Sequence, residues 1–223
     1  MSDCPPAVQP PRPTTSASPG IILALIVLPL VKAAALQALW YLPEPWNLYC
    51  TQIGIPIVYS GLAMVLAATT RTAWRLAVVS GTTWRSLASF SLIAVGLELL
   101  LRLVLTAARG DLTSWVPFFN TLRLPPIYVF RGLVGSPVGE ELLFRGWLLG
   151  FLAVRMPGVS RIGRVTLSYA NILTSLAFAL GHIANGVTAV CTAYICSLVL
   201  GAAQEQSKSL LVPIWCHFLI NLM

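Results

Sequence analysis

PVGEELLFRGWLLGFLA, residues 137–153, places two adjacent carboxylates and an arginine inside an otherwise apolar stretch. Ionisable side chains at membrane depth are costly unless they are paired, solvated or neutralised, and they therefore mark functional sites. We interpret Glu140 and Glu141 as candidate functional residues within a bilayer.

The composition of the chain supports a membrane protein. Of the 223 residues, 57% are hydrophobic and only 9% are charged, and the mean hydropathy is +0.82, which a soluble domain does not show. This length accommodates about seven or eight spans of roughly 20 residues. We predict an all-α fold, a polytopic transmembrane helix bundle of about seven to eight helices. The net charge of +7 comes mostly from arginines between apolar segments, which indicates contact with a lipid bilayer rather than nucleic acid.

The domain organisation is simple. Residues 1–19 are rich in Pro, Ser and Thr and are predicted to form a flexible tail. The apolar run of residues 20–42 is too long for the core of a cleaved signal peptide, so we expect a retained span. Residues 20–223 are then one transmembrane domain.

Seven apolar segments are candidate spans. They cover residues 20–42, 53–70, 87–107, 137–153, 165–183, 186–203 and 209–223. A further segment, residues 113–134, is interrupted by Pro117, Pro125 and Pro126 and contains Arg123 and Arg131. It fits an eighth span, a re-entrant segment or an interfacial helix.

Arginines between the segments predict an orientation. They cluster before the third span and after the span of residues 137–153, so both loops are expected in the cytoplasm. These arginines are Arg71, Arg75 and Arg85, and Arg155, Arg161 and Arg164. If residues 113–134 do not cross, seven spans place the N-terminus inside and the carboxylates toward the outer half of the bilayer.

Helical spacing predicts how the charged residues pair. Glu141 and Arg145 are four positions apart and can form an ion pair on one helix face. Glu140 points about 100° away and is left to another partner. Without such a partner, burial should make it a usable proton acceptor near neutral pH. Glu98 and Arg102 have the same spacing in the third span, where we interpret them as an internal salt bridge outside the site. Lys32 is a second candidate partner for Glu98.

Both histidines of the chain lie in apolar segments. His217 and Asn221 are four positions apart, so an imidazole and an amide project from one face of the last predicted helix. Phe178 and His182 repeat this spacing at the end of an earlier predicted helix. Ring nitrogens and amide groups in such positions can transfer protons or donate hydrogen bonds.

Taken in order, the motifs Glu-Glu-x-x-x-Arg, Phe-x-x-x-His and His-x-x-x-Asn resemble the three-motif signature of the CAAX protease and bacteriocin-processing family, also named CPBP or Abi. The resemblance covers residues 137–223. It implies a glutamic-type intramembrane endopeptidase related to the type 2 CAAX prenyl protease.

The resemblance also implies a role for each residue. Glu140 and His182 would activate water, and Arg145 would orient Glu141. His217 and Asn221 would stabilise the oxyanion of the tetrahedral intermediate. These roles are chemically reasonable, because a carboxylate can remove a proton from water while hydrogen-bond donors stabilise the developing negative charge.

Two other functions remain open from the residues alone. One glutamate and two histidines can hold a catalytic zinc ion, although the His-Glu-x-x-His helix of zinc proteases is absent. We expect no cofactor, and a chelator distinguishes the two mechanisms. A non-catalytic binding or immunity protein could use the same carboxylates to hold a cation or substrate.

The expected partner is a membrane-anchored protein or peptide. The family resemblance admits an exported protein with a C-terminal sorting tail, a CAAX-like substrate or a bacteriocin-like peptide, and the predicted orientation favours the first. The short loops favour a multi-pass protein of a bacterial inner membrane.

Overall fold

The structure, a computed structural model, describes residues 34, 38–39, 41–70, 82–109, 124–162 and 165–223. Within these ranges the chain is mostly helical, as predicted. Three helices are long and apolar enough to cross a membrane, namely Trp46–Thr70, Trp84–Ala108 and Val187–Ser207. The number of seven to eight helices stays a prediction.

Several sequence predictions fall outside the described residues. They concern the tail of residues 1–19, most of the expected first span 20–42, Lys32, and residues 113–123. Arg71, Arg75 and Arg164 also lie outside, so the predicted membrane orientation stays a prediction.

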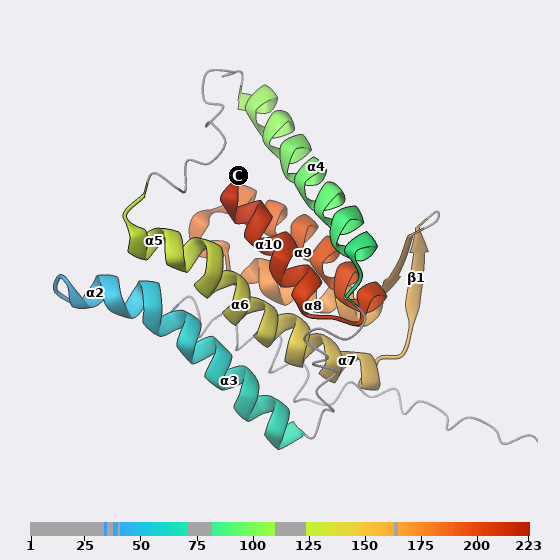
Figure 1. Cartoon of the computed structure of the whole chain (residues 1–223), viewed down its shortest axis with the longest axis horizontal. Helices are drawn as coiled ribbons and strands as arrows, with labels where there is room; N and C mark the ends of the chain where they lie inside the picture. The colour runs from blue at the N-terminus through green and yellow to red at the C-terminus, as the bar shows by residue number, and fades with distance from the viewer. Residues whose placement is uncertain (1–33, 35–37, 40, 71–81, 110–123, 163–164) are drawn as a thin grey trace, which may run out of the picture.

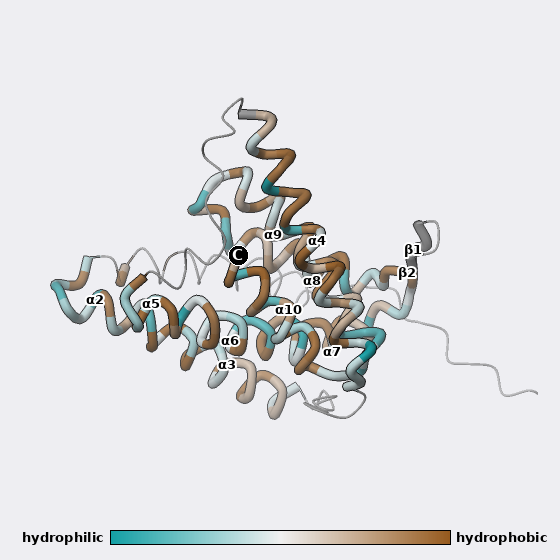
Figure 2. The backbone as a smooth tube through the Cα atoms, turned by 45° about the horizontal axis from the view of Figure 1, so that its top comes forward, coloured by the Kyte–Doolittle hydropathy of each residue, from teal (hydrophilic) through white to brown (hydrophobic). Residues whose placement is uncertain are grey.

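Two long helices run side by side (Figures 1 and 2). The first consists of α2 (Trp46–Tyr49), the π turn η1 (Cys50–Gly54) and α3 (Ile55–Thr70). The second consists of α5 (Pro126–Phe130), the π turn η4 (Arg131–Gly135), α6 (Ser136–Glu141), the π turn η5 (Leu142–Leu148) and α7 (Leu149–Arg155). The segments 113–134 and 137–153 were expected to be separate, and the structure corrects this for their described residues, because one helix runs from Pro126 to Arg155.

A π turn precedes each proline inside these helices. Pro56 and Pro137 are each the second residue of the α-helical segment that follows a π turn, directly after Ile55 and Ser136. A proline ring clashes with the carbonyl group four residues before it and offers no N–H group. The wider turn is consistent with relief of this conflict, since the Ser136 N–H group bonds to the Arg131 carbonyl five residues back. The helix therefore continues through Pro137.

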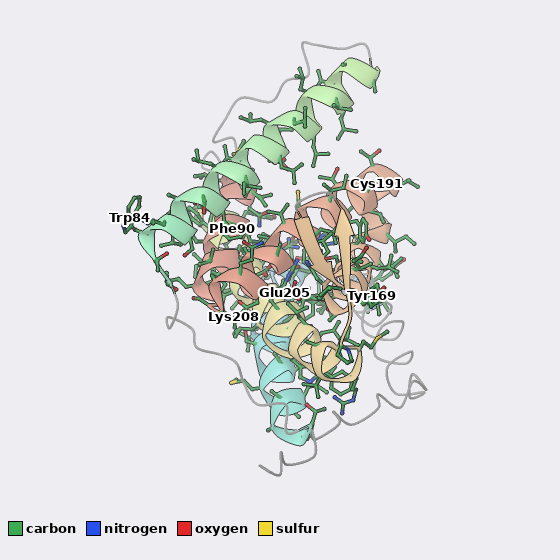
Figure 3. All side chains as sticks on the ribbon, turned by 90° about the vertical axis from the view of Figure 1, so that its right-hand side faces the viewer. Trp84, Phe90, Tyr169, Cys191, Glu205 and Lys208 are labelled. Atoms are coloured by element: carbon green, nitrogen blue, oxygen red, sulfur yellow. The ribbon has the colours of Figure 1, made fainter. Side chains whose placement is uncertain are left out.

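The helix α4 (Trp84–Arg109) leans outward from the bundle and is mostly hydrophobic (Figures 1 and 2). Its Phe90 and Ala94 pack in one core cluster with Leu200 of α9 and Val212 of α10. Many of its other apolar side chains are exposed, and Trp84 projects outward with 74% of its surface accessible (Figure 3). Exposed apolar side chains on such a helix are those expected to contact lipid.

A short antiparallel hairpin lies between α7 and α8, where the sequence analysis predicted only a loop and the start of a span at residue 165. Its strands are β1 (Val159–Ile162) and β2 (Val165–Ser168), with Val159 opposite Ser168. The helix α8 (Tyr169–Leu180) starts four residues later than expected because the Ser168 hydroxyl accepts a hydrogen bond from the Asn171 N–H group, a typical N-cap.

The last two helices complete the bundle. A 3-10 turn, η6 (Ile183–Asn185), leads to α9 (Val187–Ser207), which ends at Lys208 in the left-handed conformation. It is followed by α10 (Leu211–Leu222). Both α8 and α10 have 12 residues, or about 18 Å at roughly 1.5 Å per residue. Each is thus shorter than a full span of about 20 residues.

A buried core joins the two long helices to α8. Phe144, Trp147 and Leu148 belong to one buried cluster with Ala63 of α3 and Phe178 of α8. The ring centroids of Phe144 and Phe178 lie 5.2 Å apart in an edge-to-face arrangement. Phe178 is therefore held rigidly next to the helix that carries the two glutamates.

The crossing of α8 and α9 yields a stability prediction. A methyl group on Gly201 would lie 1.9 Å from the Asn171 Oδ1 atom, which accepts a hydrogen bond from Ser175. Gly201→Ala is expected to lower the free energy of unfolding by about 1–3 kcal/mol, because the buried amide must move and lose hydrogen bonds. Gly150→Ala is the matched control, since nothing lies within 4 Å of that added methyl group. Equal thermal unfolding of the two variants in detergent would contradict this packing.

Candidate active site

A close helix crossing positions the two glutamates. Gly135 and Gly139 are four positions apart and face Pro56 of α3. A methyl group on Gly139 would lie only 2.9 Å from the Pro56 carbonyl oxygen, so a small residue is required for this approach. The next two residues, Glu140 and Glu141, are consequently buried inside the bundle, with exposed fractions of 6% and 0%.

Glu141 is the centre of a buried ionic network. Its Oε1 atom accepts a hydrogen bond from Arg145 at 3.0 Å and lies 2.8 Å from the His217 Nδ1 atom. The pairing of Glu141 with Arg145 is the one that helical spacing predicted. With Glu141 ionised, the His217 Nδ1 atom carries the hydrogen that this contact requires, which fixes the orientation of the imidazole ring.

Arg145 joins three helices. One nitrogen donates to the Ser197 carbonyl oxygen at 3.1 Å and to its hydroxyl at 2.6 Å, and both groups belong to α9. The guanidinium carbon lies 4.7 Å from the centroid of the Phe178 ring, a cation–π distance. Because Arg145 is 2% exposed, these contacts and Glu141 provide the solvation that water would otherwise supply.

Glu140 lies beside the other nitrogen of the same imidazole. Its Oε2 atom is 3.9 Å from the His217 Nε2 atom, which is too long for a direct hydrogen bond but suits a bridging water molecule. His217 is thus located between the two carboxylates. Glu141 holds the imidazole ring, and Glu140 is close enough for one water molecule to contact both its carboxylate and the ring.

His182 and Asn221 occupy neighbouring positions. The His182 Nδ1 atom is 3.0 Å from the Phe178 carbonyl oxygen, and the His182 ring lies 4.9 Å from the Phe178 ring. Phe178 also contacts His217, with 6.0 Å between the ring centroids. Asn221 donates a hydrogen bond of 2.8 Å to the Gly132 carbonyl group, which ties α10 to η4.

A cavity of about 820 Å³ lies against this cluster. His182, His217 and Asn221 line it together with Phe178, whereas the two glutamates and Arg145 are not among the lining residues. The carboxylates are therefore located behind the His217 part of the wall. The predicted motif residues come together from three separate segments of the chain, as the shared-site hypothesis requires.

The cavity also includes polar residues that the sequence analysis left outside the site. Glu98 and Arg102 form the predicted ion pair, with 2.8 Å between Oε1 and Nε, but both line the cavity. Arg131 donates to the Gln52 Oε1 atom at 3.2 Å, and both of these residues also line it. Their spacing in sequence gave no signal for Gln52 or Arg131, since they come from different helices.

The residues that the structure describes contain no group of three His, Cys, Asp or Glu side chains arranged to hold a metal ion.

The fold and the site define a class: a helical membrane protein with a buried carboxylate–histidine network beside a cavity lined by both polar and apolar side chains. Residues 122–223 match the model of the Rce1-like family, described as type II CAAX prenyl endopeptidase Rce1-like. This part contains every predicted site residue, and over it the resemblance inferred from the motifs is confirmed. Comparisons with curated proteins and with solved structures give no match.

This family match has two general consequences. The family implies a CAAX-type intramembrane protease activity, with a protein substrate. Together with the long apolar helices, it also indicates an integral membrane protein. The match covers the helix of the two glutamates and all following elements, but not α3 or α4.

Proposed function

We propose that the protein is a glutamic-type intramembrane endopeptidase that hydrolyses a peptide bond near the C-terminus of a membrane-anchored protein. The observation that carries the proposal is the position of His217, 2.8 Å from Glu141 and 3.9 Å from Glu140, at the wall of the cavity. Such a network can orient an imidazole and a carboxylate around one water molecule.

In the proposed mechanism, Glu140 and His182 activate the water molecule. Glu140 takes a proton from water, and the oxygen attacks the carbonyl carbon of the substrate. The proton is then delivered to the leaving nitrogen as the carbon–nitrogen bond breaks. The histidine adds a second group that can accept or donate a proton beside the cavity.

His217 and Asn221 are proposed to stabilise the oxyanion. Hydrogen-bond donors fixed before the reaction stabilise the developing charge without reorganising, and this effect is largest where water is excluded. Glu141 supports the donor by holding the His217 Nδ1 atom, and Arg145 holds Glu141. These two residues act through His217 and are positioning residues.

The substrate class follows from the family and from the predicted orientation. We propose a membrane-anchored protein whose C-terminal region enters the cavity, either an exported protein with a sorting tail or a CAAX-like or bacteriocin-like substrate. The proposed location is a bacterial inner membrane, with several spans. Neither proposal requires a cofactor.

Cleavage of tail-anchored reporters in membranes tests the proposed function. The wild type is expected to cut at least one reporter in a library, and His182→Ala is expected to reduce the rate by about 10²–10⁴-fold, the usual contribution of a proton-transfer group. Ile183→Ala, at an exposed neighbouring position, is the matched control. Cleavage by His182→Ala at the wild-type rate would remove this histidine from the mechanism.

Metal removal distinguishes the glutamic mechanism from a zinc mechanism. Incubation with a chelator is expected to leave the cleavage rate unchanged, because the proposed steps use only side chains and water. Loss of cleavage that returns on addition of zinc would instead support a metal-activated water molecule. If the wild type binds reporters without cutting any, the result favours a non-catalytic binding protein.

A further inference from the structure

The two arginines that line the cavity differ in their partners. Arg102 is paired with the Glu98 carboxylate at 2.8 Å. Arg131, in contrast, makes its 3.2 Å hydrogen bond to Gln52, a neutral amide. Among the described residues, no carboxylate forms a salt bridge with Arg131. This part of the cavity therefore presents a positive charge with hydrogen-bond donors to spare.

The π turn η4 directs Arg131 toward the site. In this turn the backbone bonds span five residues, as from the Ser136 N–H group to the Arg131 carbonyl, so residues five apart lie on one face. Arg131 and Ser136 both line the cavity. Glu140 lies about one α-helical turn beyond Ser136 on the same helix. The adjacent Gly132 is bound by Asn221. Arg131 is thus located along the same helix as the carboxylates and next to the proposed oxyanion donor.

The surroundings of Arg131 favour an anionic ligand. Leu124, Tyr128 and Ile220 are also part of the cavity wall, so the guanidinium group is only partly solvated by polar neighbours. A positive charge in such a place gains most from an anion that accepts two parallel hydrogen bonds, which a carboxylate or a phosphate does. Gln52 keeps the guanidinium oriented through the bond to its amide oxygen.

We propose that Arg131 binds the C-terminal carboxylate of the peptide substrate and determines specificity for a free C-terminus. This inference rests on the proposed peptidase function and deepens it. The same chemistry could be supplied by the phosphate of a lipid headgroup, so the experiment must distinguish the two sources.

The length of the helix is compatible with this assignment. Arg131 and Glu140 are nine positions apart, or roughly 13 Å along the axis at about 1.5 Å per residue. An extended peptide covers this distance in about four residues at roughly 3.3 Å each. A peptide anchored at Arg131 would therefore bring a bond near its C-terminus to the His217 part of the cavity wall, where the Glu140 carboxylate lies 3.9 Å from the His217 Nε2 atom.

Binding and cleavage of one matched pair of peptides test the proposal. The probe is a lipidated peptide with the sequence of a cleaved reporter or, if none is cut, of a reporter that the protein binds. It is made in two forms, one with a free C-terminal acid and one with a C-terminal amide. Binding is measured with the Glu140→Gln protein in detergent micelles, with and without phosphatidylglycerol, so that the result does not depend on catalysis.

We expect the acid to bind about 10–100-fold more tightly than the amide, and Arg131→Ala to remove this preference by weakening binding of the acid alone. Arg131→Lys should keep part of it, because a lysine retains the charge but not the bidentate geometry. In the active enzyme the same change should appear in KM more than in kcat. Arg155→Ala, at the exposed end of the same helix, is the matched control.

Other outcomes overturn the proposal. Equal binding of acid and amide by the unmodified site would show that no carboxylate is recognised. An acid preference that survives Arg131→Ala, with phosphatidylglycerol affinity lost instead, would assign Arg131 to a lipid phosphate. If Arg131→Ala does not fold, Arg131→Lys and Gln52→Ala provide the comparison. A failure of cleavage with an intact, Arg131-dependent acid preference would reject the peptidase function but not the carboxylate site.

Discussion

Glu140→Gln is expected to lower the rate of reporter cleavage by about 10²–10⁴-fold while the protein stays folded. Glutamine has nearly the same shape as glutamate but cannot accept a proton from water. The glutamine side chain can occupy the same position as Glu140, whose Oε2 atom lies 3.9 Å from the His217 Nε2 atom. The measurement is the initial rate of cleavage in membranes, together with thermal unfolding in detergent.

Two comparisons make this result specific. Glu44→Gln removes a carboxylate at an exposed position and should leave the rate unchanged. Glu140→Asp retains the acid but withdraws it by one methylene group, so partial activity is expected if position as well as charge matters. Wild-type cleavage by Glu140→Gln would show that another group activates the water molecule, and His182 would become the first candidate.

The sequence was most informative where apolar length decided the structure. The segments 87–107 and 186–203 correspond to α4 and α9, because long runs of mostly apolar residues with few charges have few alternatives to a spanning helix. The motif residues were also found, because ionisable groups are rare in such surroundings. Their i,i+4 spacing was sufficient to predict the pair of Glu141 and Arg145, which depends on local geometry alone.

Prolines and short elements were harder to predict. Pro125 and Pro126 were interpreted as interruptions, whereas they precede and begin a helix that continues to Arg155. The π turn before Pro137 allows that continuation, and no simple periodicity indicates such a turn. The hairpin with strands Val159–Ile162 and Val165–Ser168 was missed because each strand has only four residues, too few for a reliable pattern.

Partners from distant segments could not be predicted. Ser197 binds Arg145 across 52 positions, and Gln52 binds Arg131 across 79. Single-sequence patterns report which face a residue occupies but not which neighbour faces it. The cavity, which depends on four or more segments at once, was accordingly visible only in the structure.

Arg145→Met is expected to lower the free energy of unfolding by about 3–5 kcal/mol, because it leaves the Glu141 charge buried without its cationic partner. Both side chains of this pair are fully buried, and Arg145 also supplies the two bonds to Ser197. Unfolding by detergent titration gives this quantity. Arg155→Ala removes an arginine near the end of the same helix, where its side chain is exposed, and should cost less than about 1 kcal/mol.

The double variant Glu141→Gln with Arg145→Met identifies the cause of that loss. If the penalty comes from an uncompensated carboxylate, the double variant should be more stable than Arg145→Met alone, since no charge is then left unpaired. If it comes only from the lost bonds to Ser197, the second substitution should not restore stability. Cleavage should stay low in either case, because His217 has lost the carboxylate that holds its Nδ1 atom. Recovery of stability without recovery of activity would therefore separate the structural contribution of Arg145 from its positioning of His217 through Glu141.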